Sequence, residues 1–133
     1  MATDFSPASL KAAERAIALA SQCGATLTIL HVININAQPA RGELGTAEEL
    51  MKQRWAEGSV QMGRLAWSLS GQVEAQTLIE EGLPWEKIVE KSGDFDLLIL
   101  GKSSAQPGWR PFSQHTVRRV IRNAARPLLV VPA

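Results

Sequence analysis

Residues 96–101 read DLLILG, and residues 128–131 read LLVV. Each is a short aliphatic run beside polar or turn-forming neighbours, which is typical of a strand buried on both faces of a parallel sheet. Residues 25–33, ATLTILHVI, have the same character. Residues 73–80 read VEAQTLIE, in which Val73, Ala75 and Thr77 alternate with Glu74, Gln76 and Leu78. This alternation predicts a half-exposed strand at a sheet edge. These stretches predict a parallel sheet.

Helical patterns separate the predicted strands. A helix begins at Ser6-Pro7, because serine can cap free N–H groups and proline at the first helical position loses no hydrogen bond. We expect it to run from about Pro7 to Cys23, before Gly24. Further helices are predicted to begin at Thr46, Pro84 and Ser113 and to end before Gly71, Gly93 and Pro127. Residues 34–45 show no period and are predicted to form a loop.

This alternation of helices and strands predicts one α/β domain over residues 1–133, an open parallel sheet with helices on both faces. A sheet of this kind usually begins with a strand. Here only Met1-Ala2-Thr3 precede Asp4. The first strand is therefore expected to be a truncated stub, or to have been lost from this chain.

Composition narrows the classes of function. The chain has 133 residues, one cysteine, two histidines and a net charge of +1, so we expect no disulfide framework and no metal site. No apolar run is long enough for a transmembrane helix and no signal peptide is recognised, so we expect a soluble cytoplasmic protein without membrane contact. Residues 101–133 carry six basic residues and no acidic one, which fits either a solvated helix face or an anion site. The near-zero net charge argues against nucleic acid as a partner.

Ligands of open α/β sheets bind beyond the carboxyl ends of the strands, which makes Asp4, Val32 and the loop after Leu100 the candidate positions. Asp4 could bind a ligand hydroxyl or amine, or could equally interact with the helix dipole. The loop contains only Gly101 and Gly108, a weak signal for phosphate.

Catalytic residues are not apparent in the sequence. Cys23 is expected in the core and His31 is expected to pack in the sheet. His115 is expected at the surface or lining a pocket, with no nucleophile beside it. We therefore expect no enzymatic activity.

Four segments together resemble the universal stress protein family. Residues 2–20, ATDFSPASLKAAERAIALA, and 25–33 resemble the start of these domains, and residues 96–104, DLLILGKSS, and 116–133, TVRRVIRNAARPLLVVPA, resemble their end. The resemblance implies a Rossmann-like, five-stranded parallel sheet of order 3-2-1-4-5. It also implies a role in stress responses and a homodimer paired through Leu128–Val131.

One branch of the family binds ATP through a loop with the pattern GxxG, nine residues, then G[ST]. Carried over by position, Gly101 matches the first glycine, whereas Ser104, Gln114 and His115 replace the remaining residues. Asp4 and Val32 match the family's adenosine-contacting aspartate and adenine-pocket valine. The family positions that would bind a nucleotide here are Asp4, Val32, Leu100, Gly101, Ser104, Gln114, His115 and Thr116.

The chain therefore resembles the branch with a degenerate ATP-binding motif. Two functions remain open from the sequence. The first is a dimeric, non-enzymatic stress-response domain that acts through contacts with unidentified proteins. The alternative is a sensor that binds ATP or AMP, although no cofactor is firmly implied.

Overall fold

The computed structural model describes residues 1–36, 45–102 and 114–132. Strands and helices alternate along these residues, and every strand pairing among them is parallel. The elements are β1 (Ala2–Thr3), α1 (Pro7–Cys23), β2 (Leu27–Asn34), α2 (Ala47–Leu69), β3 (Ala75–Gly82), α3 (Pro84–Ser92), β4 (Leu98–Lys102), α4 (Gln114–Asn123) and β5 (Leu128–Pro132). The predicted α/β class is confirmed.

The strands form two ladders, one in the order β1-β2-β3 and one of β4 with β5. The first strand is two residues long, as the stub before Asp4 predicted. β1 contacts β4, yet the described strands form no ladder between them. The expected continuous order 3-2-1-4-5 is therefore not confirmed, because the two-residue β1 forms a ladder with β2 and none with β4 among the described strands.

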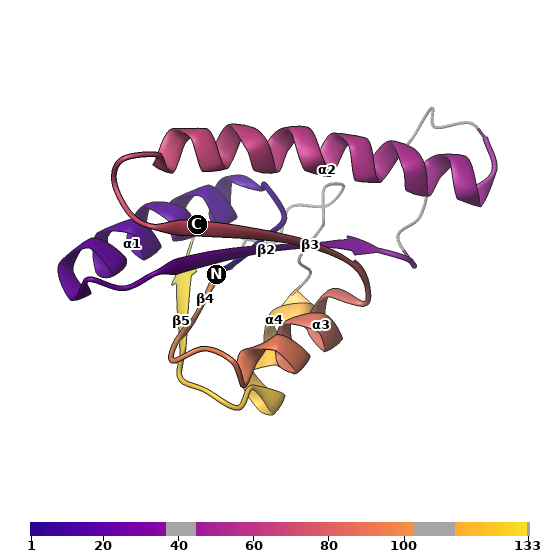
Figure 1. Cartoon of the computed structure of the whole chain (residues 1–133). Helices are drawn as coiled ribbons and strands as arrows, with labels where there is room; N and C mark the ends of the chain where they lie inside the picture. Colours follow the sequence, from indigo (N-terminus) through magenta and orange to yellow (C-terminus); the bar gives the residue numbers. More distant parts are fainter. Residues whose placement is uncertain (37–44, 103–113, 133) are drawn as a thin grey trace.

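Helices cover both faces of the strands (Figure 1). Helix α1 packs on β4 and β5 and α2 on β2 and β3, whereas α3 and α4 lie on the opposite face. Successive strand residues point to opposite faces, so Ile29 and Ile99 join the core under α1 and α2. Leu30 and Leu100 join the core under α3 and α4. β2 and β4 are thus largely buried on both sides, as their aliphatic runs predicted. The prediction was wrong for β5, which is half-exposed apart from Val131, because it pairs with β4 on one side only.

The helix termini follow the sequence signals. The Ser6 hydroxyl accepts a hydrogen bond from the Ser9 N–H at 3.3 Å and caps α1. Thr46 and Glu49 form a reciprocal capping box at the start of α2. Gly24 ends α1 in a left-handed conformation with φ of 64°. The Ala25 N–H still donates to the Ala20 carbonyl at 2.9 Å, so β2 begins two residues later than predicted.

Two further features differ from or extend the prediction. Cys23 was expected in the core but is exposed, because the buried residues of α1 end at Ala20 and Cys23 is the last residue of the helix. Strand β3 is half-exposed along its length, as its alternating pattern predicted. None of the helices in the described ranges is both long and apolar enough to span a membrane.

Candidate functional site

The first turn of α1 brings two of the predicted site residues together. Asp4 follows β1, and its carboxylate reaches the Ser9 side chain. Gly101 in β4 lies against the backbone of Ala8 and Ser9 in the same turn. Val32 and Leu100 belong to one buried apolar cluster on the face covered by α3 and α4. Asp4, Val32, Leu100 and Gly101 therefore gather around the carboxyl ends of the central strands.

The Asp4 carboxylate is buried and is used to build the start of α1. Its Oδ1 accepts hydrogen bonds from the Ser6 N–H at 2.9 Å and from the Ser9 hydroxyl at 2.5 Å. The Asp4 N–H donates in turn to the Ser9 hydroxyl at 3.3 Å. Asp4 is only 7% exposed. Of the two roles left open by the sequence, these contacts favour the stabilisation of the helix terminus.

Phe5 is the feature of this site that the sequence did not predict. Its φ of 61° is in the left-handed region, which is uncommon for a bulky residue and costs roughly 1–2 kcal/mol. The Phe5 N–H donates to the Thr3 hydroxyl at 3.0 Å, which helps to hold the turn. Its ring lies 4.5 Å from the His31 ring. A non-glycine residue with positive φ carries no sequence signature, so the turn could not have been recognised beforehand.

His31 joins β1, β2 and α2. Its Nδ1 lies 2.9 Å from the Thr3 carbonyl oxygen, so this nitrogen carries the hydrogen of the neutral ring. Gly58 of α2 lies over the other side of the ring. Burial lowers the pKa of His31, although the Thr3 carbonyl and the Asp4 carboxylate act in the opposite direction. The ring is thus held as a neutral packing group, as expected.

Gly101 is required by the packing of β4 on α1. A Cβ atom at this position would lie 2.4 Å from the Ala8 carbonyl oxygen and 2.7 Å from the Ser9 nitrogen. Real Cβ atoms do not approach backbone atoms so closely, so the fold itself requires glycine here. The match of Gly101 to the phosphate-loop pattern is therefore explained without a phosphate.

The remaining predicted site residues lie in or before α4. Ser104 lies outside the described residues, and Gln114 is the first residue of the helix. Thr116 is buried, whereas His115 is exposed. The exposed basic residues of this segment include Arg119, whose guanidinium lies 4.7 Å from the centre of the Trp85 ring. Part of the basic face of α4 is thus occupied by packing on α3.

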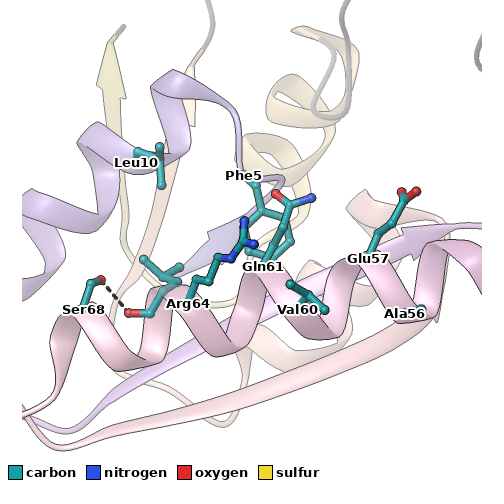
Figure 2. Close-up of a pocket in the computed structure, with 9 residues that line it drawn as sticks. Phe5, Leu10, Ala56, Glu57, Val60, Gln61, Arg64 and Ser68 are labelled. Atoms are coloured by element: carbon teal, nitrogen blue, oxygen red, sulfur yellow. Dashed lines mark hydrogen bonds between the residues drawn. The ribbon is translucent and has the colours of Figure 1, made fainter.

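A shallow groove of about 680 Å³ lies between α2 and the start of α1 (Figure 2). Leu10 and Val60 project into it from the two helices, with the Arg64 side chain between them. The Ser68 hydroxyl donates to the Leu65 carbonyl at 2.7 Å at one end. Among the described residues that line the groove, Phe5 is the one that lies outside a helix. The groove lining within the described part of the chain includes none of the predicted positions Asp4, Val32, Leu100 and Gly101.

Metal ligands are not grouped in the described part of the chain. Residues 1–36, 45–102 and 114–132 contain no cluster of three or more His, Cys, Asp and Glu side chains that could hold a metal ion. Cys23 is exposed at the end of α1, whereas His31 lies within β2 and contacts the Thr3 carbonyl, so the two are not placed as a nucleophile and base pair.

Comparison with known proteins identifies the family. The universal stress protein family model matches residues 1–132, and the chain belongs to this family. Universal stress protein MJ0531 of Methanocaldococcus jannaschii is 30% identical, over 97% of this chain and 78% of the relative. Universal stress protein Slr1230 of Synechocystis is also 30% identical, over 86% of this chain, which spans 47% of that longer protein.

Solved structures agree on the fold. The structure of the hypothetical protein MJ0577 matches 99% of this chain and 92% of its own with a TM-score of 0.78, at 24% sequence identity. The resemblance noted in the terminal segments of the sequence is thus confirmed, together with the Rossmann-like arrangement that it implied.

Proposed function

We propose that this chain is a homodimeric stress-response domain that acts through protein contacts, catalyses no reaction, and binds ATP weakly or not at all. The proposal rests on one observation: Asp4 and Gly101, two site residues that match the family pattern, both make contacts that build the fold. The Asp4 carboxylate accepts hydrogen bonds from Ser6 and Ser9, and Gly101 packs on the backbone of Ala8. Both residues therefore have a structural reason to be present.

The sequence of the loop indicates that it would bind phosphate only weakly. A backbone cradle depends on N–H groups that phosphate oxygens can approach without a Cβ in the way. Ser104, Gln114 and His115 add side chains where the ATP-binding branch has Gly, Gly and Ser or Thr. Hydrogen bonds to a charged group contribute about 1.5–3 kcal/mol each. The loss of two would raise the dissociation constant by about 100-fold or more.

Basic side chains offset only part of this loss. Lys102, Arg118 and Arg119 are exposed and close in sequence to the loop. Exposed ion pairs contribute about 0–1 kcal/mol each, since water and salt screen them. Arg119 also packs on Trp85. Direct charge contact alone is therefore a weak substitute for a backbone cradle.

The alternative function is that of an adenine-nucleotide sensor. A universal stress protein solved in complex with cAMP has the same fold, with a TM-score of 0.60 and 20% identity. In this chain Asp4, Val32 and Gly101 would contact the nucleotide, and the basic face of α4 would receive the phosphates. Similarity at this level supports the shared fold, so the ligand has to be tested directly.

Calorimetry with ATP and magnesium, and separately with AMP and cAMP, decides between the two functions. We expect no heat of binding, or a dissociation constant well above the micromolar range, and no nucleotide in a mass spectrum of the denatured protein. The double variant Ser104→Gly with Gln114→Gly is the matched control. It should strengthen ATP binding if side-chain crowding is the cause. A low-micromolar constant for the unaltered protein would favour the sensor.

A further inference from the structure

Helix α2 carries a second apolar stripe on the side that faces away from the strands. Its buried residues are Gly58, Met62, Leu65 and Leu69. Residues two positions apart in a helix project about 200° from each other, so the residues between these positions point to the opposite side. That side forms the outside of the described chain (Figure 1). The exposed residues along it, which we call the outer stripe, are Ala56, Val60, Gly63 and Trp67.

The two large side chains of the outer stripe lie in water. Trp67 is 83% exposed and Val60 is 55% exposed. Single exposed apolar residues are common on protein surfaces. A continuous stripe is not, and tryptophan is among the residues that contribute most to protein contacts. The outer stripe therefore has the character of an interaction surface.

Gly63 gives a second indication of a partner. The other glycine of α2, Gly58, is explained by packing, since a Cβ atom there would lie 3.1 Å from the His31 ring. A Cβ atom at Gly63 would meet no atom of the described residues within 4 Å. Glycine destabilises a helix interior relative to alanine, and its usual benefit is the close approach of another group. We therefore expect a partner to pack against Gly63.

The outer stripe is complementary in shape to a second copy of itself. Its residues are separated by four, three and four positions, which is the spacing of contact residues in a coiled coil. When two copies of α2 run antiparallel about a two-fold axis at the middle of the stripe, Val60 faces the partner's Gly63. Trp67 then faces the partner's Ala56, and each contact occurs twice. A large side chain thus meets a small one along the whole stripe.

Charged residues beside the outer stripe favour the same arrangement. Glu57 and Arg64 lie on one flank of the stripe, towards the groove of Figure 2. No ion pair between described residues uses either side chain. Flanking charges of paired helices meet across the contact and determine its orientation. The same two-fold axis brings Glu57 to the partner's Arg64, so the antiparallel pair has two contacts between opposite charges.

We propose that the outer stripe binds a second copy of this chain, with the two α2 helices antiparallel and Trp67 of each packed on Ala56 of the other. The stripe is only about 16 Å long. A helix contact of this length buries less area than a stable interface of about 1,600 Å², so we expect a dissociation constant in the millimolar range. Helix α2 packs on β2 and β3, whereas β5 pairs with β4. The α2 contact therefore does not depend on pairing through β5, and both can form at once.

Disulfide trapping between two variants tests the contact and its orientation. One variant carries Ala56→Cys and the other Trp67→Cys, and both carry Cys23→Ser because the native thiol is exposed. Mixed at millimolar concentration with oxidised glutathione, the two variants should form a disulfide with each other about tenfold or more faster than either forms one with itself. The reason is that like positions of antiparallel copies lie about 16 Å apart, too far for a disulfide. Equal rates would indicate random collision and faster self-disulfides a parallel pair, and either result would overturn the proposal. The absence of any mixed disulfide would also overturn it, and would leave the stripe for a helix of another protein.

Charge reversal in the same pair of variants provides a matched control. Glu57→Arg added to the Ala56→Cys variant should slow the trapping about threefold or more at low salt, because an attraction becomes a repulsion. Arg64→Glu added to the Trp67→Cys partner should restore the rate, since the reversed charges attract again. Circular dichroism checks that the variants fold. An unchanged rate after the first reversal, or no recovery after the second, would overturn the antiparallel arrangement.

Discussion

Mutation of Asp4 tests whether its carboxylate stabilises the fold, independently of any ligand. In Asp4→Ala, the buried Ser6 N–H and Ser9 hydroxyl lose their acceptor. We expect a loss of about 1–3 kcal/mol in the free energy of unfolding, measured by urea denaturation. Asp4→Asn retains an acceptor oxygen and should lose less. Unchanged stability in Asp4→Ala would contradict the structural role proposed here.

Two glycines provide a matched pair at the same scale. Gly101→Ala would place its Cβ atom 2.4 Å from the Ala8 carbonyl oxygen. Neither atom can move away by rotation of a side chain, because the Cβ atom is fixed to the backbone of β4 and the oxygen belongs to the backbone of α1. We expect a loss of more than about 2 kcal/mol in stability. Gly63→Ala in α2 meets no atom within 4 Å. It should gain about 0.5–1 kcal/mol, because alanine favours a helix. Thermal denaturation of both variants checks the prediction, and a neutral Gly101→Ala would contradict it.

Contact between β2 and α2 depends on a neutral His31. Burial lowers its pKa in the folded protein below the ordinary value of 6.5. The unfolded chain therefore binds the proton first, and stability that is present above pH 6.5 is lost as pH falls through the folded pKa. The protonated ring would also be charged beside Phe5 and Gly58. We expect the urea midpoint to fall as the pH is lowered below 6.5.

The variant His31→Gln should reduce this acid-sensitive loss, whereas His115→Gln, at an exposed position, should leave it unchanged. The Met1 amine contributes a separate loss between pH 8 and 6, since burial lowers its pKa to about 6. Both His31→Gln and the unaltered protein retain the Met1 amine, so its effect on stability cancels in the difference between their pH profiles. An identical pH profile in the two proteins would contradict a role for His31.

The elements were predictable where local chemistry determines them. Ser6-Pro7, the capping box at Thr46 and the left-handed Gly24 each act within one turn, so the sequence located those helix ends. The aliphatic runs likewise predicted the buried strands β2 and β4, but the run of β5 did not reveal that this strand is half-exposed. Local signals did not predict the left-handed Phe5 or the exposed Cys23, because each depends on how separate elements meet.

The candidate site was predictable only as a set of positions. The placement of Asp4, Val32 and Gly101 near the ends of central strands follows from parallel topology. The structural roles of Asp4 and Gly101 do not follow from the topology. Gly101 packs on Ala8, which is distant in the sequence, and the Asp4 carboxylate binds Ser9 in a buried position.

The whole molecule has two outer strands with different chemistry. β3 carries Glu80 and Glu81, and charged side chains on an edge strand disfavour pairing with another chain. β5 is LLVVP, without a charge, and Leu129 is 37% exposed. An uncharged aliphatic edge is a template for strand pairing. This contrast favours β5 over β3 as the place where two copies meet.

A single substitution on β5 tests the dimer without breaking the fold. The Leu98 N–H donates to the Pro127 carbonyl, so the backbone groups of Leu129 face β4 and those of Val130 face outward. Val130→Pro removes an outward N–H and leaves the ladder with β4 intact, because proline is tolerated where an edge N–H faces away.

In sedimentation experiments at high micromolar concentration, we expect a dimer for the unaltered protein and a monomer for Val130→Pro, with unchanged circular dichroism. Thr77→Pro on β3, whose N–H faces outward because the Glu74 and Gly82 carbonyls face β2, is the control at the other outer strand, and its oligomeric state should remain dimeric. A monomeric unaltered protein, or a Val130→Pro variant that folds and still dimerises, would mean that two copies do not pair through β5.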